Sequence, residues 1–153
     1  MNIQIRHAHV DEAPLVAVLV SRLLAELGDE VDSRALLEIT RKLLIAGDVA
    51  ALILLVDDRP AGVVTLNQCA AIYAGGRFGE ICELYVGPED RSAGLGQHLI
   101  AAAVDYARKA GWTRLEVGAP EQPRWQRTTD FYRANGFTLV GPRLTRPIDR
   151  ETG

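Results

Sequence analysis

The chain is poor in the residues that build metal centres and covalent cross-links. Its 153 residues include 2 cysteines and 3 histidines, and neither type recurs at the spacing of a zinc site. Cys69 and Cys82 are too few for a disulfide framework, so we expect two small buried thiols in a reducing compartment. The sequence therefore predicts a fold that is stabilised without disulfides, and no metal site.

Long apolar runs and a strong excess of one charge are also missing. No run reaches the roughly 18 to 20 apolar residues of a membrane-spanning helix, and the first residues lack the basic and apolar segments of a signal peptide. The 17 Lys and Arg residues stand against 20 Asp and Glu, a formal net charge of −3 that argues against a broad nucleic-acid surface. We expect a cytoplasmic protein that binds neither membranes nor nucleic acids.

What the chain does contain is typical of one ordinary globular domain. It is 48% hydrophobic and 24% charged, and its length suffices to bury a core, so we predict a single domain over 1–153. Apolar residues recur at strand or helical spacing along the chain, and Asp11 is the expected cap of the first helix. Strands are predicted at 2–6, 49–56, 63–73, 78–86, 112–117 and 137–141, and helices at 11–28, 34–46, 94–110 and 125–134.

Residues 49–86 are expected to form an antiparallel meander. The loop between the strands at 63–73 and 78–86 sets the register in which these two strands pair. If residues 74–77 form a four-residue hairpin loop, positions whose numbers sum to 151 face each other. Cys69 is then expected opposite Cys82.

The stretch from Glu83 to Gly111 joins a strand to a helix through a glycine-rich loop. The strand ends before Pro88, and Gly94 and Gly96 open the helix that follows. Such a junction directs unpaired N–H groups and the positive end of the helix dipole at one spot, which suits a phosphate or pyrophosphate. Arg91 can add a charge-assisted hydrogen bond to a phosphate oxygen.

Two common nucleotide-binding motifs do not fit this stretch. A dinucleotide fingerprint needs Gly-x-Gly-x-x-Gly, and Leu99 stands where the third glycine belongs. The antiparallel meander before the loop is also the wrong context for a nicotinamide site. A P-loop needs Gly-Lys followed by Ser or Thr, which the chain lacks.

Two segments of the chain stand out in combination. One is Val86-x-Pro88-x-x-Arg91-x-x-Gly94-x-Gly96-x-x-Leu99, and the other is Phe131-Tyr132-x-x-Asn135-Gly136-Phe137. Each is weak alone, but together, and with the order of elements, they resemble the GNAT superfamily of acetyl-CoA-dependent N-acetyltransferases over nearly the full chain. The resemblance implies an α/β (α+β) fold with a mixed, largely antiparallel central sheet of six to seven strands and about four helices.

The resemblance also implies where acetyl-CoA, the co-substrate, binds. In the family the glycine loop binds the pyrophosphate, and the strand before it splays from its neighbour, here 113–117, to bond the pantetheine amides. A backbone N–H near Tyr85 or Val86 would stabilise the oxyanion of the tetrahedral intermediate. The residues expected to bind acetyl-CoA are Leu84, Tyr85, Val86, Arg91, Ser92, Ala93, Gly94, Leu95, Gly96 and Gln97.

Two residues are candidates for proton transfer. The attacking amine must lose a proton, and the departing thiolate is helped by gaining one. Glu83 is the base candidate and Glu80 the second choice; on a regular strand their odd spacing puts them on opposite faces. By resemblance, Tyr132 is the general acid to the coenzyme A thiolate. The alternatives are a strand-face or capping carboxylate for Glu83 and Glu80, and a core aromatic for Tyr132.

The start of the last helix departs from the family pattern. The family often has Asn and Ala seven and four residues before the tyrosine, where this chain has Trp125 and Thr128. The usual Asn contact to coenzyme A is therefore not carried over. Arg124 or Arg127 meets a phosphate or an anionic substrate group, or both are solvated at a helix start, which is the favoured alternative.

These features lead us to expect acetyl transfer from acetyl-CoA to a primary amine by direct attack, without a metal. A small-molecule amine is favoured, and the acidic stretch 28–33 with Glu80 and Glu83 points to a cationic one. Acetylation of a protein or peptide, and a non-catalytic acyl-CoA-binding domain, are the alternatives. Dimers are common in the family, so the resemblance also allows a homodimer.

Overall fold

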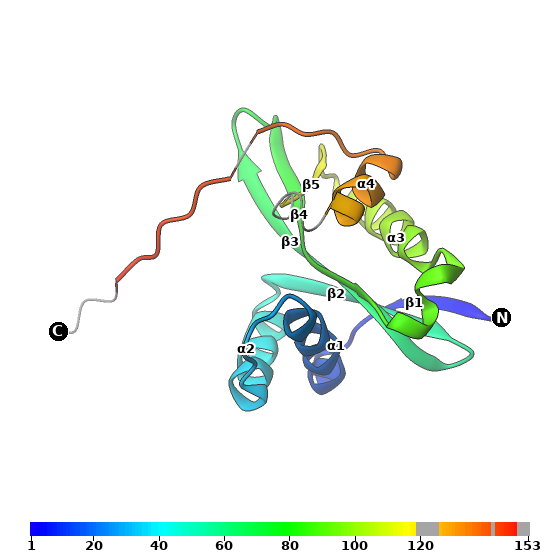
Figure 1. Ribbon diagram of the computed structural model, residues 1–153. Helices are drawn as coiled ribbons and strands as arrows, with labels where there is room; N and C mark the ends of the chain where they lie inside the picture. Colours follow the sequence, from blue (N-terminus) through cyan, green and yellow to red (C-terminus); the bar gives the residue numbers. More distant parts are fainter. Residues whose placement is uncertain (119–125, 142, 150–153) are drawn as a thin grey trace. The chain divides into compact units, whose positions relative to one another are not determined.

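The computed structural model describes residues 1–118, 126–141 and 143–149 (Figure 1). The chain falls into two compact units, Met1–Val117 and Gly118–Gly153. The first unit contains a sheet with helices, and the second contains one described helix followed by an irregular segment. No helix that the structure describes is long and apolar enough to cross a membrane. The single domain expected from the sequence stays a prediction.

The first unit is built on one sheet whose strands follow each other in chain order. The strands are β1 (Ile3–His7), β2 (Val49–Val56), β3 (Arg59–Ala71), β4 (Gly76–Val86) and β5 (Leu115–Val117). The helices are α1 (Ala13–Glu26), α2 (Ser33–Ala46), α3 (Leu95–Ala110) and, in the second unit, α4 (Gln126–Ala134). Strands β1 to β4 pair antiparallel, and β5 pairs parallel to β4, with helix α3 in the connection between them. The predicted fold class is confirmed, although the described residues form five strands rather than six to seven.

Helices cover both faces of the sheet. One face packs against α1 and α2, and α3 lies on the opposite face (Figure 1). The α1–α2 side holds a buried cluster of Ala8, Val16, Leu19, Val20, Ala51, Ile53, Leu55, Val63 and Tyr85. On the other side α3 buries Leu95, Leu99, Ile100, Ala103 and Ala107, which recur at helical spacing. Cover on both faces explains why β2 is apolar throughout.

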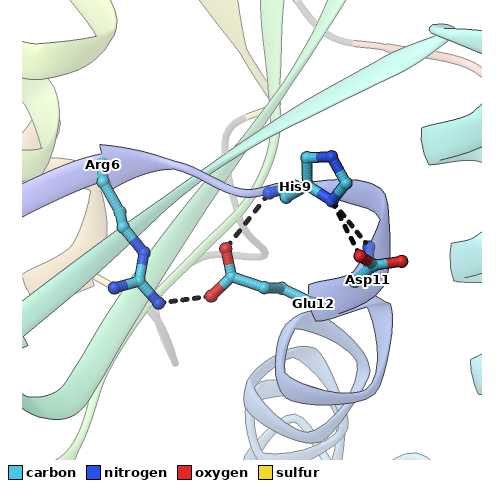
Figure 2. A network of polar contacts seen from close by, with 4 residues as sticks. All are labelled: Arg6, His9, Asp11 and Glu12. Atoms are coloured by element: carbon cyan, nitrogen blue, oxygen red, sulfur yellow. Dashed lines mark hydrogen bonds and ion pairs between the residues drawn. The ribbon is translucent and has the colours of Figure 1, made fainter.

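The first helix begins differently from the prediction. A short 3-10 helix, η1 (Val10–Glu12), precedes α1, and its cap is His9 rather than Asp11. The His9 ring nitrogen Nδ1 accepts a hydrogen bond from the Asp11 N–H (3.3 Å), and the Glu12 carboxylate accepts from the His9 N–H (3.1 Å) and from Arg6 (Figure 2). The bonds between His9 and residues 11 and 12 are reciprocal, so the chain begins to turn into η1 at His9, two residues before the predicted cap, and α1 itself begins at Ala13.

The β3–β4 hairpin turns two residues earlier than predicted. Its loop is residues 72–75, because glycines at and just after the loop end adopt positive φ angles of 78° and 127°, which glycine reaches most easily. Cys69 therefore lies opposite Phe78, and its predicted pairing with Cys82 is wrong. The side chain of Cys69 is half-buried and that of Cys82 is exposed, so the prediction of two buried thiols is also wrong.

A β-bulge interrupts β4 at Cys82. Glu83 pairs with Thr65 on β3, but the paired residue before it is Ile81, which lies opposite Leu66. Cys82 is therefore the extra residue of the bulge. A strand bends and twists more strongly at such a point, so β4 changes direction there.

The bulge also changes which faces the two candidate bases occupy. Glu80 pairs with Asn67, and Glu83 pairs with Thr65. Paired residues share a face, and Asn67 and Thr65 share one as well because they are two positions apart on β3. Glu80 and Glu83 therefore lie on the same face, whereas a regular strand would separate them. Tyr85, two residues beyond Glu83, belongs to the cluster under α1 and α2, so this is the face that those helices cover.

Residues 137–141, predicted as a strand, form no strand in the described part of the second unit. Leu139 and Val140 are 57% and 81% exposed. A short run of β-favouring residues is extended and stable only where a neighbouring strand takes its hydrogen bonds. Local residue preference therefore overestimated the number of strands.

Gly79→Ala tests the fit between β4 and the turn before β5. A Cβ at Gly79 would lie 2.2 Å from ring atoms of Trp112, whose Nε1 donates to Gln68 Oε1 at 2.8 Å and loses that bond if the ring swings away. We expect the free energy of unfolding, measured by urea titration, to fall by about 1–3 kcal/mol.

The matched control is the double variant Gly79→Ala/Trp112→Leu. Its loss of stability should be smaller than the sum of the two single losses, because the smaller side chain removes the clash. Additive losses would contradict the clash.

Candidate functional site

The site expected from the sequence begins where β4 separates from β5. The parallel ladder pairs residues 79–81 with 115–117 and ends there. Beyond the bulge β4 continues to Val86, paired on its other edge with β3. Within the described first unit, no strand pairs with the β5-side edge of residues 84–86. An extended ligand with amide groups can bond to such an edge as an added strand.

The Glu83 carboxylate is held by Thr65 across the β3–β4 pair. The Thr65 hydroxyl donates to Glu83 Oε2 and accepts from the Glu83 N–H at 3.0 Å. Thr65 is buried, and Glu83 is half-buried. The predicted base is therefore fixed at the sheet face by one of its two oxygens.

The loop after β4 presents the start of α3 without a side-chain cap. Residues 88–93 form a 3-10 turn, η2 (Pro88–Ala93), and Gly94 adopts left-handed backbone angles (φ 72°, ψ 21°). A Cβ at Gly94 would meet nothing within 4 Å, so a ligand has room to approach the main chain there. No described side chain caps α3, so the first N–H groups of the helix face water or an anion, except that of Gln97, which donates to the Gly94 carbonyl at 3.3 Å.

Arg91 has partners within the first unit. Its Nε donates to the Val86 carbonyl at 2.9 Å, and its Nη2 donates to the two Glu26 carboxylate oxygens at 2.5 and 2.7 Å. The guanidinium also lies 5.8 Å from the centre of the Tyr85 ring. Arg91 thus fixes the loop to the end of β4 and to the end of α1, and its contact with a phosphate stays a prediction. The motif marked Arg91, but nothing in it indicated Glu26.

A second ion pair, which the sequence did not reveal, holds the same loop to β3. Asp90 is 7% exposed and accepts two hydrogen bonds from Arg59, at 3.0 and 3.1 Å. These bonds, with the negative charge of Asp90, raise the pKa of Arg59 above its ordinary value. No local pattern links the two residues, because 31 positions separate them and only the folded sheet brings them together.

In the second unit, residues 131–137 form a helix end that fixes Tyr132. The Phe137 N–H donates to the Tyr132 carbonyl and the Gly136 N–H to the Arg133 carbonyl, both at 3.1 Å, with Gly136 at φ 94°. This is the Schellman pattern, which is often closed by an apolar contact, and the Tyr132 and Phe137 rings lie 5.5 Å apart. Burial raises the pKa of Tyr132 to about 12, so the phenol stays protonated at neutral pH.

The structure brings only part of the predicted set together. Glu83, residues 84–86 and residues 91–97 follow one another around the end of β4 in the first unit. Tyr132 belongs to the second unit. Its proposed action on the same thioester stays a prediction.

The remaining candidates belong to the second unit. Arg124 and Trp125 lie outside the described residues, and Arg127 is exposed in the first turn of α4. In the ranges that the structure covers, no group of three or more His, Cys, Asp or Glu side chains is placed to hold a metal ion.

The raised pKa of Tyr132 makes folding stability depend on pH. Below about pH 10 the phenol is protonated in both the folded and the unfolded chain. Between about pH 10 and 12 the unfolded chain loses this proton first, so the folded state binds more protons and stability falls as pH rises. We expect the unfolding temperature to fall less steeply over this range in Tyr132→Phe than in the wild type.

The control for this measurement is Tyr73→Phe, whose ring is 76% exposed. That variant should follow the wild-type curve. Equal slopes in all three proteins would contradict the effect of burial on Tyr132.

Comparison with known proteins identifies the family of this chain. The family model described as the Acetyltransferase (GNAT) family matches residues 17–137, from within α1 to the end of the Phe131–Phe137 segment. No curated protein sequence matches the chain.

Solved structures share the fold over nearly the whole chain. A ribosomal-protein-alanine N-acetyltransferase from Brucella melitensis biovar Abortus 2308 is 21% identical, with a TM-score of 0.78 over 97% of this chain and 100% of that one. An aminoglycoside acetyltransferase from an uncultured soil metagenomic sample, in complex with sisomicin, is 19% identical, with a TM-score of 0.77 over 97% of each chain. A predicted acetyltransferase from Clostridium acetobutylicum, with acetyl-CoA, is 17% identical, with a TM-score of 0.78 over 95% of this chain and 96% of that one. These likenesses show the fold, and the family model, which matches most of the chain, shows that the protein belongs to the GNAT family of acetyltransferases.

Proposed function

We propose that the protein transfers the acetyl group of acetyl-CoA to a primary amine of a small molecule. Membership of the GNAT family makes acyl transfer the class of reaction. The observation that carries the proposal is the path of β4, which leaves β5 at a bulge and runs through a glycine loop into an uncapped helix. A cytoplasmic location and a homodimer are part of the same proposal.

The glycine loop suits the pyrophosphate of acetyl-CoA. In this proposal the main-chain N–H groups of residues 92–97 bind its oxygens, helped by the positive end of the α3 dipole. The empty space beside Gly94 leaves room for close approach, and the unpaired edge of residues 84–86 bonds to the pantetheine amides. A structure with the same fold and with acetyl-CoA supports this choice of donor.

Glu83 and Tyr132 act on the amine and on the departing sulfur in the proposed reaction. Glu83 accepts a proton from the amine, directly or through a water, and the nitrogen lone pair attacks the thioester carbonyl carbon. A main-chain N–H of Tyr85 or Val86 stabilises the oxyanion. As the carbonyl re-forms and the C–S bond breaks, Tyr132 donates a hydrogen bond to the departing sulfur, and the nitrogen releases its second proton, which converts the thiolate to a thiol. The pKa of the Tyr132 phenol, about 12, is higher than that of a thiol. Tyr132 therefore stabilises the departing sulfur by a hydrogen bond and keeps its own proton.

The charge around the bulge favours a cationic acceptor. Glu80 and Glu83 share one sheet face, and the acidic stretch 28–33 connects the two helices that cover this face. A protonated amine is attracted to such a site before it loses its proton. The fold shared with an aminoglycoside acetyltransferase supports a small-molecule acceptor, and the fold shared with a ribosomal-protein-alanine N-acetyltransferase keeps a peptide as the second candidate.

A thiol-release screen decides among the candidates. The protein is given acetyl-CoA together with small amines, aminoglycosides or peptides with free N-termini, and released coenzyme A is measured. A higher kcat/KM for small amines than for peptides supports the proposal, whereas the reverse order would identify a peptide acetyltransferase. Binding of acetyl-CoA without turnover of any acceptor would identify a non-catalytic acyl-CoA-binding domain.

Tyr132→Phe tests the donor to the sulfur. The variant removes one hydroxyl and keeps the ring between its aromatic neighbours, so we expect kcat to fall about 100-fold or more. The dissociation constant of acetyl-CoA, measured by isothermal titration, should stay within about twofold of the wild type. Unchanged kcat would rule out this role.

Gly94→Ala tests the cofactor loop. Alanine is strained in the left-handed region, and its methyl group would enter the space proposed for the pyrophosphate. We expect the dissociation constant of acetyl-CoA to rise about tenfold or more, since each tenfold change needs only about 1.4 kcal/mol.

Gly111→Ala is the matched control for strain. Gly111 ends α3 with nearly the same backbone angles (φ 75°, ψ 24°), and a Cβ there also meets nothing within 4 Å. Both variants should lose similar stability, but only Gly94→Ala should weaken acetyl-CoA binding. Equal affinities in the two variants would count against the assigned loop.

A further inference from the structure

Thr65 is an unusual residue for the place that it occupies in the sheet. Its side chain is 3% exposed, and Val63 and Tyr85, its neighbours on the same face, belong to the apolar cluster under α1 and α2. A buried hydroxyl costs free energy unless it is hydrogen-bonded, whereas valine would fill a similar volume without a polar group. A hydroxyl at this buried position therefore implies a specific hydrogen-bond partner.

Both hydrogen-bonding functions of the Thr65 hydroxyl are used by Glu83. The Glu83 N–H donates to Thr65 Oγ1 at 3.0 Å, and the hydroxyl hydrogen is donated to Glu83 Oε2. A main-chain N–H can only donate, so the hydroxyl oxygen accepts from it and the single hydroxyl hydrogen is left for Glu83 Oε2. The two bonds close a ring that includes the main chain and side chain of Glu83, and this ring restricts the side-chain torsions of Glu83.

The β4 bulge creates this arrangement. Up to Ile81 the paired positions of β3 and β4 sum to 147, a register in which Thr65 would face Cys82. The extra residue moves Glu83 into that place. Because a shift of one residue exchanges the two faces of a strand, the bulge brings the Glu83 side chain to the face of Thr65.

We infer that Thr65 is a positioning residue for the acetyl transfer, holding the Glu83 carboxylate by Oε2 so that Oε1 is left for the incoming amine. The inference rests on the proposed function, in which Glu83 takes the proton of the amine. A glutamate side chain samples several rotamers, and a base that must reach one geometry acts faster when the others are excluded. Thr65 acts only through Glu83 and does not touch the reacting atoms.

Three variants separate positioning from packing. Thr65→Val removes the hydroxyl, and Thr65→Ser keeps it. Val63→Ala is the matched control, because it damages the same buried face of β3 without removing a bond to Glu83. Each variant is assayed at steady state with acetyl-CoA and the best amine of the screen, and its folding is followed by thermal unfolding.

Thr65→Val should lower kcat about 10- to 100-fold and leave the KM for acetyl-CoA unchanged. Thr65→Ser should stay within about threefold of the wild-type kcat, because it retains both bonds. Val63→Ala should lower the unfolding temperature without this loss of kcat. In a Glu83→Gln background, Thr65→Val should add little further loss, since the two residues act as one unit. Wild-type kcat in Thr65→Val, or equal losses in Thr65→Val and Val63→Ala, would overturn the inference.

A measurement without turnover separates this inference from the proposed function. The ¹³C resonance of the Glu83 carboxyl carbon is assigned by its disappearance in Glu83→Gln. Its chemical shift should change in Thr65→Val and stay the same in Thr65→Ser. An unchanged chemical shift in Thr65→Val overturns the inference even if the enzyme is active.

The two proposals fail in different ways. A resonance that moves in a protein that acetylates no amine supports the positioning and contradicts the proposed function. Full kcat in Glu83→Gln overturns Glu83 as the base and Thr65 as its positioning residue together, while acetyl transfer itself stands.

If Thr65→Val does not fold, Thr65→Ala replaces it, because alanine also removes the donor and is smaller than valine.

Discussion

One extra residue in β4 determines the geometry of the first unit. The bulge at Cys82 lets β4 pair with β5 before that point and leave it afterwards, and it sets Glu83 on the face that α1 and α2 cover. A bulge needs support, because it interrupts the ladder that would otherwise hold the strand straight. Thr65 provides that support from β3 through its two bonds to Glu83. Strand direction and carboxylate position are therefore set by the same contact.

The loop that follows is held from two sides before any ligand arrives. Arg59 binds Asp90 from β3, and Glu26 binds Arg91 from α1. A loop that is already ordered loses less conformational entropy when it binds an anion, so more of the contact free energy appears as affinity. Among the described residues no side chain caps the start of α3, so the positive end of the helix is open to an anion.

Local signals were the ones that the sequence could predict. β2 has the predicted bounds, and α2 and α3 begin within one residue of prediction and end as predicted, because Gly47 and Gly111 stop them in the left-handed geometry that glycine favours. The glycine loop and the Tyr132 segment were recognisable for the same reason: each is one turn with its own residue requirements. The bulge and the partners of Asp90 and Arg91 were not, since they depend on residues 18 to 65 positions apart in the chain that only the fold brings together. The hairpin register was missed because the loop begins two residues earlier than predicted.

The bond between Arg91 and Glu26 has a consequence for loop grafting. Glu26 is the last residue of α1, so the acidic connection to α2, which is proposed to attract the cationic acceptor, starts directly after the residue that holds the donor loop. A graft that replaces residues 27–32 keeps this anchor, while one that begins at Glu26 removes it. Acceptor preference can thus be redesigned independently of the donor loop only from residue 27 onward.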